Sequence, residues 1–271
     1  MYKLVAVDMD GTLLREDKTI SKETLRAIEK AKTRGVKIVL STGRPIAGIK
    51  RYLEQLDLLN ENDYAIAYNG ALVQNTKTLE IVAQTLMSST DVSYLYNISK
   101  DLKVNIHALT DSSCITPKWS KYSQLEKDIN DIPLEIVDFD NLASDTTIVK
   151  IMMIDEPEVL SEAVKKLPKE VYERYSVLRS APYFLEFLDK KVNKGYGVEL
   201  LAKKLGIKSE EVICIGDAGN DIHMIKFAGL GVAMGNAFPE VKEIADFITL
   251  SNENNGVAHV INKFVLKEKV S

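Results

Sequence analysis

The fold is decided by residues 4–12, which read Leu4-Val5-Ala6-Val7-Asp8-Met9-Asp10-Gly11-Thr12. An unbroken apolar run of this length is typical of a parallel strand buried on both faces, and here it ends directly in polar residues. Ser21 is placed to cap a helix that Gly35 ends, and residues 36–40 repeat the apolar strand pattern. A strand, a helix and a second strand make a βαβ unit, so the beginning of the chain predicts an α/β fold.

The same pattern, an apolar strand that ends in polar residues, returns only near the end of the chain. There residues 212–215 form a third apolar run that leads into Gly216-Asp217-Ala218-Gly219-Asn220-Asp221. In between, Asn69-Gly70 gives a hairpin signal, and strands predicted at 148–154 and 170–178 flank a helix that begins at Pro157. Residues 84–188 carry a net charge of −6, from 11 basic and 17 acidic side chains, whereas the remainder carries +2. We therefore expect a core of residues 1–83 and 189–271 with an inserted α+β domain at 84–188.

Length and composition describe an ordinary globular chain. Its 271 residues are 45% hydrophobic and 27% charged, and no apolar run reaches the roughly 18 to 20 residues that span a bilayer. With no secretory signal pattern after Met1, we expect a cytoplasmic protein without a membrane partner. The net charge is −4 and like charges do not cluster, which argues against a nucleic-acid partner. Cys114 and Cys214 are too few for a disulfide scaffold or a zinc site, so the expected partner is a small molecule, and the oligomeric state is unknown.

Carboxylates collect where the predicted strands end. Asp8 and Asp10 are two residues apart, so in an extended chain their side chains point to the same face. Asp217 and Asp221 follow the third strand, and the carboxyl ends of parallel strands share one crevice. Four carboxylates there would repel each other strongly unless a cation neutralised them, and an all-oxygen donor set suits Mg²⁺, which in turn favours a phosphate ligand. The plainer alternative, acidic residues that decorate loops, suits one isolated aspartate better than this set.

A second polar cluster follows the strand at 36–40. Thr42, Gly43 and Arg44 lie where we expect the strand to meet a helix with Pro45 in its first turn, and free backbone amides there can hold an anion. The alternative is an N-cap threonine beside a surface arginine. Lys194, at the start of a later helix, is one of many basic residues outside the insert, and spacing alone does not select it.

Together these motifs resemble the haloacid dehalogenase (HAD) superfamily, in its Cof-type sugar-phosphatase branch. The resemblance rests on Asp8-Met9-Asp10-Gly11-Thr12, Thr42-Gly43-Arg44, Asn69-Gly70-Ala71, Asn193-Lys194-Gly195 and Gly216-Asp217-x-x-Asn220-Asp221, which stand in the order of the family's motifs. It implies an α/β fold, with a Rossmann-like doubly wound parallel-sheet core and an inserted α+β cap domain at 84–188. The sequence departs from the family at Asn254-Asn255-Gly256, where relatives usually carry an acidic residue before the glycine. The cap matches no motif, which leaves the substrate open.

The resemblance also implies roles for individual residues. Asp8 would attack a phosphomonoester to give an aspartyl phosphate, while Asp10 would protonate the leaving alkoxide and later activate water. Mg²⁺ would bind the Asp8 carboxylate, the backbone carbonyl of Asp10 and the Asp217 carboxylate. The remaining implied roles are phosphate binding by Thr42, Gly43, Arg44 and Lys194, support of the metal's ligands by Asn220 and Asp221, and substrate contact by Asn69.

The function that follows is Mg²⁺-dependent hydrolysis of small phosphorylated metabolites, above all sugar phosphates. Two alternatives use the same core. A phosphotransferase or mutase would pass the phosphoryl group from Asp8 to a second hydroxyl, and a ligand-sensing protein would keep the core without catalysis. The presence of Asp8, Asp10, Thr42, Lys194 and Asp217 in one chain argues against the non-catalytic alternative.

Overall fold

The computed structural model describes residues 1–110 and 112–268. The chain divides into two compact units, one made of Met1–Ile46, Lys50–Ala83 and Asn193–Ser271 and the other of Ala47–Ile49 and Gln84–Val192. We call the first unit the core and the second the insert. The insertion expected at 84–188 falls within the second unit, and its standing as a separate cap domain remains a prediction.

The core is built on an eight-stranded sheet in the order β14-β13-β12-β1-β2-β3-β4-β5. From β14 to β3 the neighbouring strands are parallel, and β4 then pairs antiparallel with β3. The strands are β1 (Leu4–Val7), β2 (Lys37–Ser41), β3 (Tyr64–Ala67), β4 (Leu72–Asn75), β5 (Ile81–Gln84), β12 (Val212–Gly216), β13 (Leu230–Ala233) and β14 (Phe247–Ile248). Every residue of β1 and β12 is buried, as their unbroken apolar sequences require.

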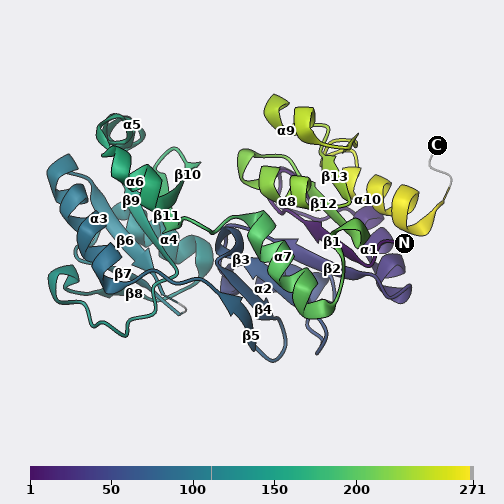
Figure 1. Ribbon diagram of the computed structural model, residues 1–271, viewed down its shortest axis with the longest axis horizontal. Coiled ribbons are helices and arrows are strands. Elements are labelled where there is room, and N and C mark those ends of the chain that lie inside the picture. The colour runs from purple at the N-terminus through teal and green to yellow at the C-terminus, as the bar shows by residue number, and fades with distance from the viewer. Residues whose placement is uncertain (111, 269–271) are drawn as a thin grey trace. The chain divides into compact units, whose positions relative to one another are not determined.

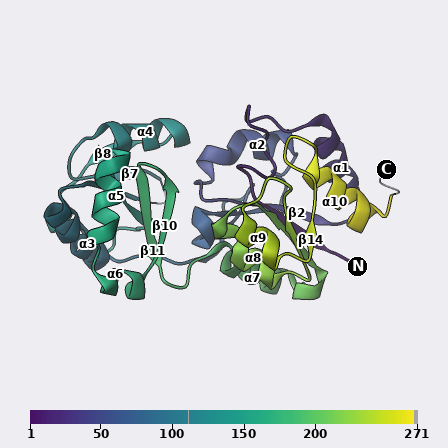
Figure 2. The ribbon, with the colours of Figure 1, turned by 90° about the horizontal axis from the view of Figure 1, so that it is seen from above.

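Helices cover both faces of this sheet. Figure 2 shows α1, α2 and α10 on one side of the strands and α7, α8 and α9 on the other. The α-helices are α1 (Lys22–Thr33), α2 (Lys50–Gln55), α7 (Lys194–Leu205), α8 (Ile222–Phe227), α9 (Pro239–Ile244) and α10 (Gly256–Val260). The core also contains three 3₁₀ turns, η2 (Tyr68–Gly70), η4 (Ser209–Glu211) and η5 (Gly219–Asp221), and the π-helix η6 (Ile261–Leu266).

The insert has its own sheet, in the order β10-β11-β9-β6-β7-β8 (Figure 1). Its strands are β6 (Asn105–Leu109), β7 (Cys114–Thr116), β8 (Leu134–Ile136), β9 (Lys150–Ile154), β10 (Tyr175–Ala181) and β11 (Phe184–Asp189). Its helices are η1 (Ala47–Ile49), α3 (Ser89–Leu102), α4 (Lys121–Asn130), η3 (Phe139–Asn141), α5 (Pro157–Lys166) and α6 (Lys169–Arg174).

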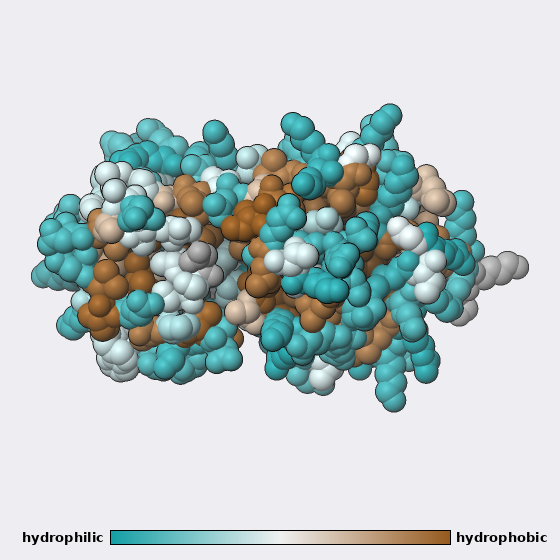
Figure 3. Space-filling view, turned by 90° about the horizontal axis from the view of Figure 1, so that it is seen from below, coloured by the Kyte–Doolittle hydropathy of each residue, from teal (hydrophilic) through white to brown (hydrophobic). Residues whose placement is uncertain are grey.

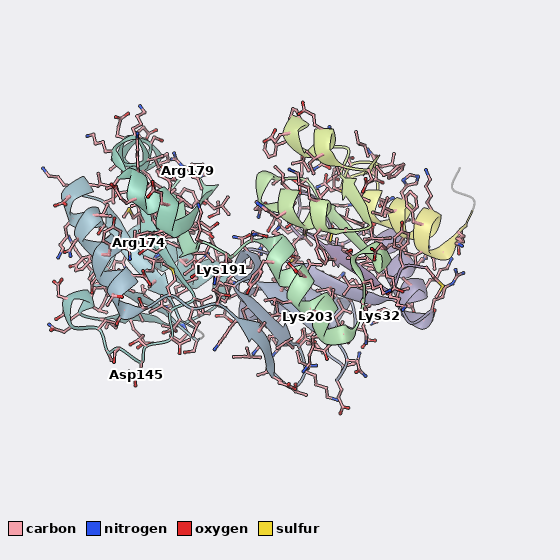
Figure 4. The ribbon with its side chains drawn as sticks, viewed as in Figure 1. Lys32, Asp145, Arg174, Arg179, Lys191 and Lys203 are labelled. Carbon is pink, nitrogen blue, oxygen red and sulfur yellow. The ribbon has the colours of Figure 1, made fainter. Side chains whose placement is uncertain are left out.

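The two faces of the insert sheet are covered differently. Side chains of α3, α5 and α6 pack with Ile151 and Met153 in one apolar cluster, while Tyr122 and Leu125 of α4 pack with Met152 in another. Because neighbouring residues of β9 point to opposite faces, α4 lies on the face opposite α3, α5 and α6. On the first of these faces, Arg174 of α6 makes a cation–π contact with Tyr94 of α3. Its guanidinium, labelled in Figure 4, lies 4.3 Å from the centroid of the Tyr94 ring.

The predicted fold class is confirmed, since a parallel-rich α/β sheet dominates the core. Two local predictions are wrong. Residues 170–174 belong to helix α6, which starts after Pro168, and the strand begins only at Tyr175. No helix begins at Pro45 either, because the backbone carbonyls of Thr42 and Arg44, which a first turn would use, accept hydrogen bonds from Asn69 and Tyr68. Helix α2 starts at Lys50, so Thr42, Gly43 and Arg44 lie in a loop.

The surface is mixed in character. On the face drawn in Figure 3, hydrophilic side chains surround separate hydrophobic patches. Within the described residues, no helix is both long and apolar enough to cross a membrane.

Candidate active site

The site forms where the central strands of the core end. Strand β1 lies between β12 and β2, and Val7 is in register with Ile215 on one side and Leu40 on the other. Asp8 follows β1 and Asp217 follows β12, so the two carboxylates leave adjacent strands at the same edge of the sheet. This is the edge at which open parallel sheets bind their ligands.

Lys194 joins the carboxylates. Its Nζ atom lies 2.5 Å from Oδ1 of Asp8 and 2.6 Å from Oδ1 of Asp221, and its side chain is 1% exposed. Lys194 is the first residue of α7, whose N-cap is Asn193, so the start of that helix fixes where the amine reaches the site. The structure thus gives Lys194 a position that its spacing in the sequence does not reveal.

Asp221 is held from both ends of its carboxylate. Its Oδ2 accepts hydrogen bonds from the backbone amides of Asp217 and Ala218, at 2.9 and 3.0 Å, while Oδ1 accepts from Lys194. A Cβ on Gly216 would lie 2.5 Å from the Asp221 side chain, so glycine is required there for the carboxylate to approach. Asp221 therefore supports the turn that carries Asp217 and orients the lysine.

Asp217 is positioned by the loop after β1. The hydroxyl of Thr12 donates to its Oδ1 at 2.7 Å. A Cβ on Gly11 would lie 2.4 Å from its Oδ2, and Gly11 also has a φ of +84°, which glycine adopts most readily. The sequence assigns no role to Thr12, although this residue belongs to the first motif.

The electrostatics reflect crowding of like charges. Burial raises the pKa of Asp8 well above its usual value, the nearby charge of Asp221 raises it further, and Lys194 opposes both. Burial likewise raises the pKa of Asp217, against the hydrogen bond from Thr12. Burial alone would lower the pKa of Lys194, but the charges of Asp221 and Asp8 outweigh it and raise that pKa. One buried ammonium thus faces three carboxylates.

This donor set fits a hard divalent cation. Asp8, Asp217 and Asp221 each offer a carboxylate oxygen, and these oxygens lie within 4.8 Å of one another. Both oxygens of Asp221 accept hydrogen bonds, from Lys194 and from the backbone, whereas Asp8 accepts one from Lys194 and Asp217 accepts one from Thr12, and the carboxyl groups of Asp8 and Asp217 also lie within hydrogen-bonding distance of each other. Oxygen ligands with excess negative charge are what Mg²⁺ requires.

Asp10 lies apart from this group. Its carboxylate accepts two hydrogen bonds from Arg44, from Nε at 2.9 Å and Nη2 at 2.7 Å, and a third from Lys18 Nζ at 2.8 Å. Burial raises the pKa of Asp10, but the bond from Lys18 and the charge of Arg44 outweigh it, and the net shift is downward. Arg44, which the sequence assigns to phosphate, is thus paired with Asp10 in this structure.

The remaining candidates meet beside β2. Thr42 is buried, and its hydroxyl accepts from the backbone amide of Arg44 at 3.2 Å. Asn69 is buried at a φ of 55° and accepts a hydrogen bond from Asn220 at 3.0 Å. A Cβ on Gly43 would lie 3.1 Å from the Asn69 side chain, so this loop and η2 pack closely. The structure therefore brings all the predicted residues to one edge of the core sheet.

The chain matches the family model of haloacid dehalogenase-like hydrolases over residues 5–261. It belongs to that family. A Bacillus subtilis (strain 168) relative named "Putative phosphatase YxeH" is 48% identical over 98% of this chain and 99% of its own, and the B. subtilis 5-amino-6-(5-phospho-D-ribitylamino)uracil phosphatase YcsE is 32% identical over 97% and 96%. Among solved structures, a haloacid dehalogenase-like hydrolase from Bacteroides thetaiotaomicron has a TM-score of 0.86 at 32% identity, covering 97% of this chain and 99% of that one. The HAD subclass IIB sugar phosphatase BT4131 has a TM-score of 0.80 at 26% identity, covering 97% and 98%.

Family membership confirms the resemblance read from the motifs and the predicted enzyme class, a HAD-like phosphomonoester hydrolase. Use of a divalent metal is typical of this family, and the aspartate cluster is suited to hold one. The individual roles of the site residues remain predictions, and the geometry above supplies the means to test them.

Proposed function

We propose that this HAD-like phosphatase hydrolyses small phosphorylated metabolites, with sugar phosphates as the preferred class, through an aspartyl phosphate on Asp8. The observation that carries the proposal is the buried amine of Lys194, held between Asp8 and Asp221 at the end of β1. The preference for sugar phosphates is supported by the similarity to a HAD subclass IIB sugar phosphatase.

The geometry suits Asp8 to act as a nucleophile. Its Oδ1 accepts a hydrogen bond from Lys194, whose charge favours the ionised form of Asp8 against burial and Asp221, and we assign the attack to the other oxygen. That oxygen attacks phosphorus, the bond from phosphorus to the substrate's ester oxygen breaks, and the departing alkoxide takes a proton from Asp10, which has to enter this step protonated although Lys18 and Arg44 lower its pKa in the structure without substrate. Water then attacks phosphorus, Asp10 takes up its proton, and the bond from phosphorus to Asp8 breaks, which releases inorganic phosphate and restores the carboxylate.

The other site residues complete this assignment. The carboxylates of Asp8 and Asp217 and the backbone carbonyl of Asp10 would hold Mg²⁺, which supplies positive charge to the phosphoryl oxygens. In the proposal, Asn220 and Asp221 support the ligands, Thr42, Gly43, Arg44 and Lys194 bind the phosphoryl group, and Asn69 contacts the substrate. We assign selection among substrates to the insert, acting as a cap.

The test measures inorganic phosphate released from a panel of phosphorylated metabolites, with Mg²⁺ and after chelation. We expect sugar phosphates to give the highest kcat/KM and Asp8→Asn to give no turnover. A phosphorylated product with little free phosphate would show a phosphotransferase or mutase instead. Exchange of residues 84–188 for the matching segment of YcsE tests the cap: it should move the preference ranking, and an unchanged ranking would place selection in the core.

A further inference from the structure

Lys18 lies in the loop after β1 in a conformation that is costly for a lysine. Its φ is +64°, in the left-handed region that glycine and asparagine adopt more readily. The surrounding loop enforces it, because the backbone amide of Arg15 donates to Thr19 and that of Lys18 donates to Arg15, both at 3.0 Å. The Tyr52 hydroxyl adds a hydrogen bond to the Lys18 carbonyl at 3.3 Å. Strained backbone is often found at functional sites, so it is a reason to ask what this side chain does, although strain alone does not assign a function.

The side chain of Lys18 reaches Asp10. Its Nζ lies 2.8 Å from Oδ1 of Asp10, the oxygen that Arg44 Nη2 also contacts at 2.7 Å. Arg44 comes from the loop after β2, whereas Lys18 comes from the same loop as Asp10, so two segments hold one carboxylate. The guanidinium contacts both oxygens and so fixes the plane of the carboxylate, and the ammonium adds a second positive charge to one of these oxygens.

Stability does not account for this arrangement. The side chain of Lys18 is 50% exposed and that of Asp10 is 42% exposed, and ion pairs with this exposure contribute little to folding. The left-handed backbone at Lys18 works against folding. An ion pair that is kept at a strained position without a gain in stability is better explained by its effect on Asp10.

We propose that Lys18 is a positioning residue, which with Arg44 holds the carboxylate of Asp10 in the orientation for proton exchange with the leaving alcohol. The inference rests on the proposed function, in which Asp10 is the acid and base. It makes a specific demand: loss of Lys18 should slow formation of the aspartyl phosphate only from substrates whose leaving group needs a proton, whereas hydrolysis of the intermediate, which uses Asp10 as a base, should slow for every substrate. A primary alkyl phosphate needs that proton, whereas p-nitrophenyl phosphate expels a stable anion without it.

The experiment compares the first-turnover rate of leaving-group release by the full-length, Mg²⁺-loaded enzyme, measured by rapid quench, on the best alkyl phosphate and on p-nitrophenyl phosphate. For Lys18→Met we expect the first-turnover rate on the alkyl ester to fall roughly tenfold to a hundredfold, the scale of a misplaced catalytic group, with the substrate concentration at half-maximal rate changed little. The first-turnover release of p-nitrophenol should stay within about twofold of wild type, although later turnovers slow, and Lys18→Arg should recover most of the loss on the alkyl ester. Lys267→Met is the matched control, because Lys267 is exposed and also has a positive φ of 55°.

Lys18→Gly distinguishes the loss of the amine from a loss of folding stability, because it removes the amine and at the same time relieves the backbone strain. We expect a melting temperature at or above that of the wild type together with the same selective loss of activity. Equal losses of the first-turnover rate on both esters, no loss on either, or no recovery by Lys18→Arg would overturn the positioning role. Asp10→Asn is measured alongside. If its first-turnover rate falls equally on both esters, the proposed acid role of Asp10 fails. If Asp10→Asn loses rate mainly on the alkyl ester but Lys18→Met does not, only the role of Lys18 is refuted.

Discussion

Replacing Lys194 by methionine should destabilise the core more than any surface change on the same helix. Methionine has a similar length, so the main loss is the charge that lies 2.5 Å from Asp8 and 2.6 Å from Asp221. Removing one partner of a buried ion pair costs about 3–5 kcal/mol, because an unpaired buried charge remains. Since two carboxylates lose the same partner, we expect the upper part of that range, about 4–5 kcal/mol, out of a total stability of roughly 5–15 kcal/mol.

The effect should depend on pH in a defined direction. Burial and Asp221 already raise the pKa of Asp8, and the charge and hydrogen bond of Lys194 oppose them. Without Lys194 this opposition is lost, so the pKa of Asp8 should rise further. A carboxyl group whose pKa is higher in the folded state binds its proton more tightly there, so the folded state gains stability as the pH falls towards that pKa. The stability difference between wild type and Lys194→Met should therefore be largest near pH 8 and shrink towards pH 5.

The assay is thermal unfolding followed by circular dichroism, with chelator present, across this pH range. For a domain of this size 1 kcal/mol corresponds to about 2–4 °C, so the unfolding midpoint should fall by roughly 8–20 °C at pH 8. Lys203→Met is the control, because Lys203 is exposed on the same helix α7 (Figure 4) and should change the midpoint by less than about 2 °C. A fall at pH 8 no larger than that of the control, or one that grows towards pH 5, would refute the buried-charge reasoning.

The other predictions concern the nucleophile, the metal and the loop after β1. Asp8→Asn should abolish phosphate release while the far-ultraviolet circular dichroism spectrum stays unchanged, because the amide matches the carboxylate in shape but cannot form an acyl phosphate; more than a few per cent of wild-type rate would disprove the assignment. Exhaustive chelation should silence the enzyme, Mg²⁺ should restore it and Ca²⁺ should restore it poorly because its bonds are longer and less regular; full activity without metal, verified by elemental analysis, would contradict this. Gly11→Ala should weaken Mg²⁺ binding at least tenfold by titration calorimetry, since its Cβ would lie 2.4 Å from Asp217 Oδ2, and unchanged affinity would show that Asp217 is not a ligand.

The polar residues at the strand ends of the core could be predicted, because the sequence signals for these strands lie within a few neighbouring residues. Asp8 and Asp217 each follow an apolar run buried on both faces, and parallel strands that carry such runs must bring their ends to one edge. Helix starts with a clear cap, such as Ser21 before α1, were equally accessible. These signals need no knowledge of the rest of the chain.

The parts that could not be predicted depend on distant contacts. Pro45 favours a helix start, but hydrogen bonds from Tyr68 and Asn69 take the carbonyls that such a start would use. Lys18 belongs to none of the sequence motifs, and only the folded loop brings its amine to Asp10. The role of Thr12 likewise depends on Asp217, which lies far away in the sequence. Such pairings arise from tertiary structure, which local propensity does not encode.

The central claim is that Asp8 carries the phosphoryl group during turnover, and trapping that group tests it most directly. Asp10→Asn should let p-nitrophenyl phosphate load the enzyme, since this leaving group needs no proton, while hydrolysis of the intermediate slows for lack of a base. After acid quenching with radiolabelled substrate, we predict a stoichiometric label that hydroxylamine removes, located on the peptide that contains Asp8 and absent in Asp8→Asn. Release of p-nitrophenol by Asp10→Asn without any such label, or a label on another residue, would contradict the account.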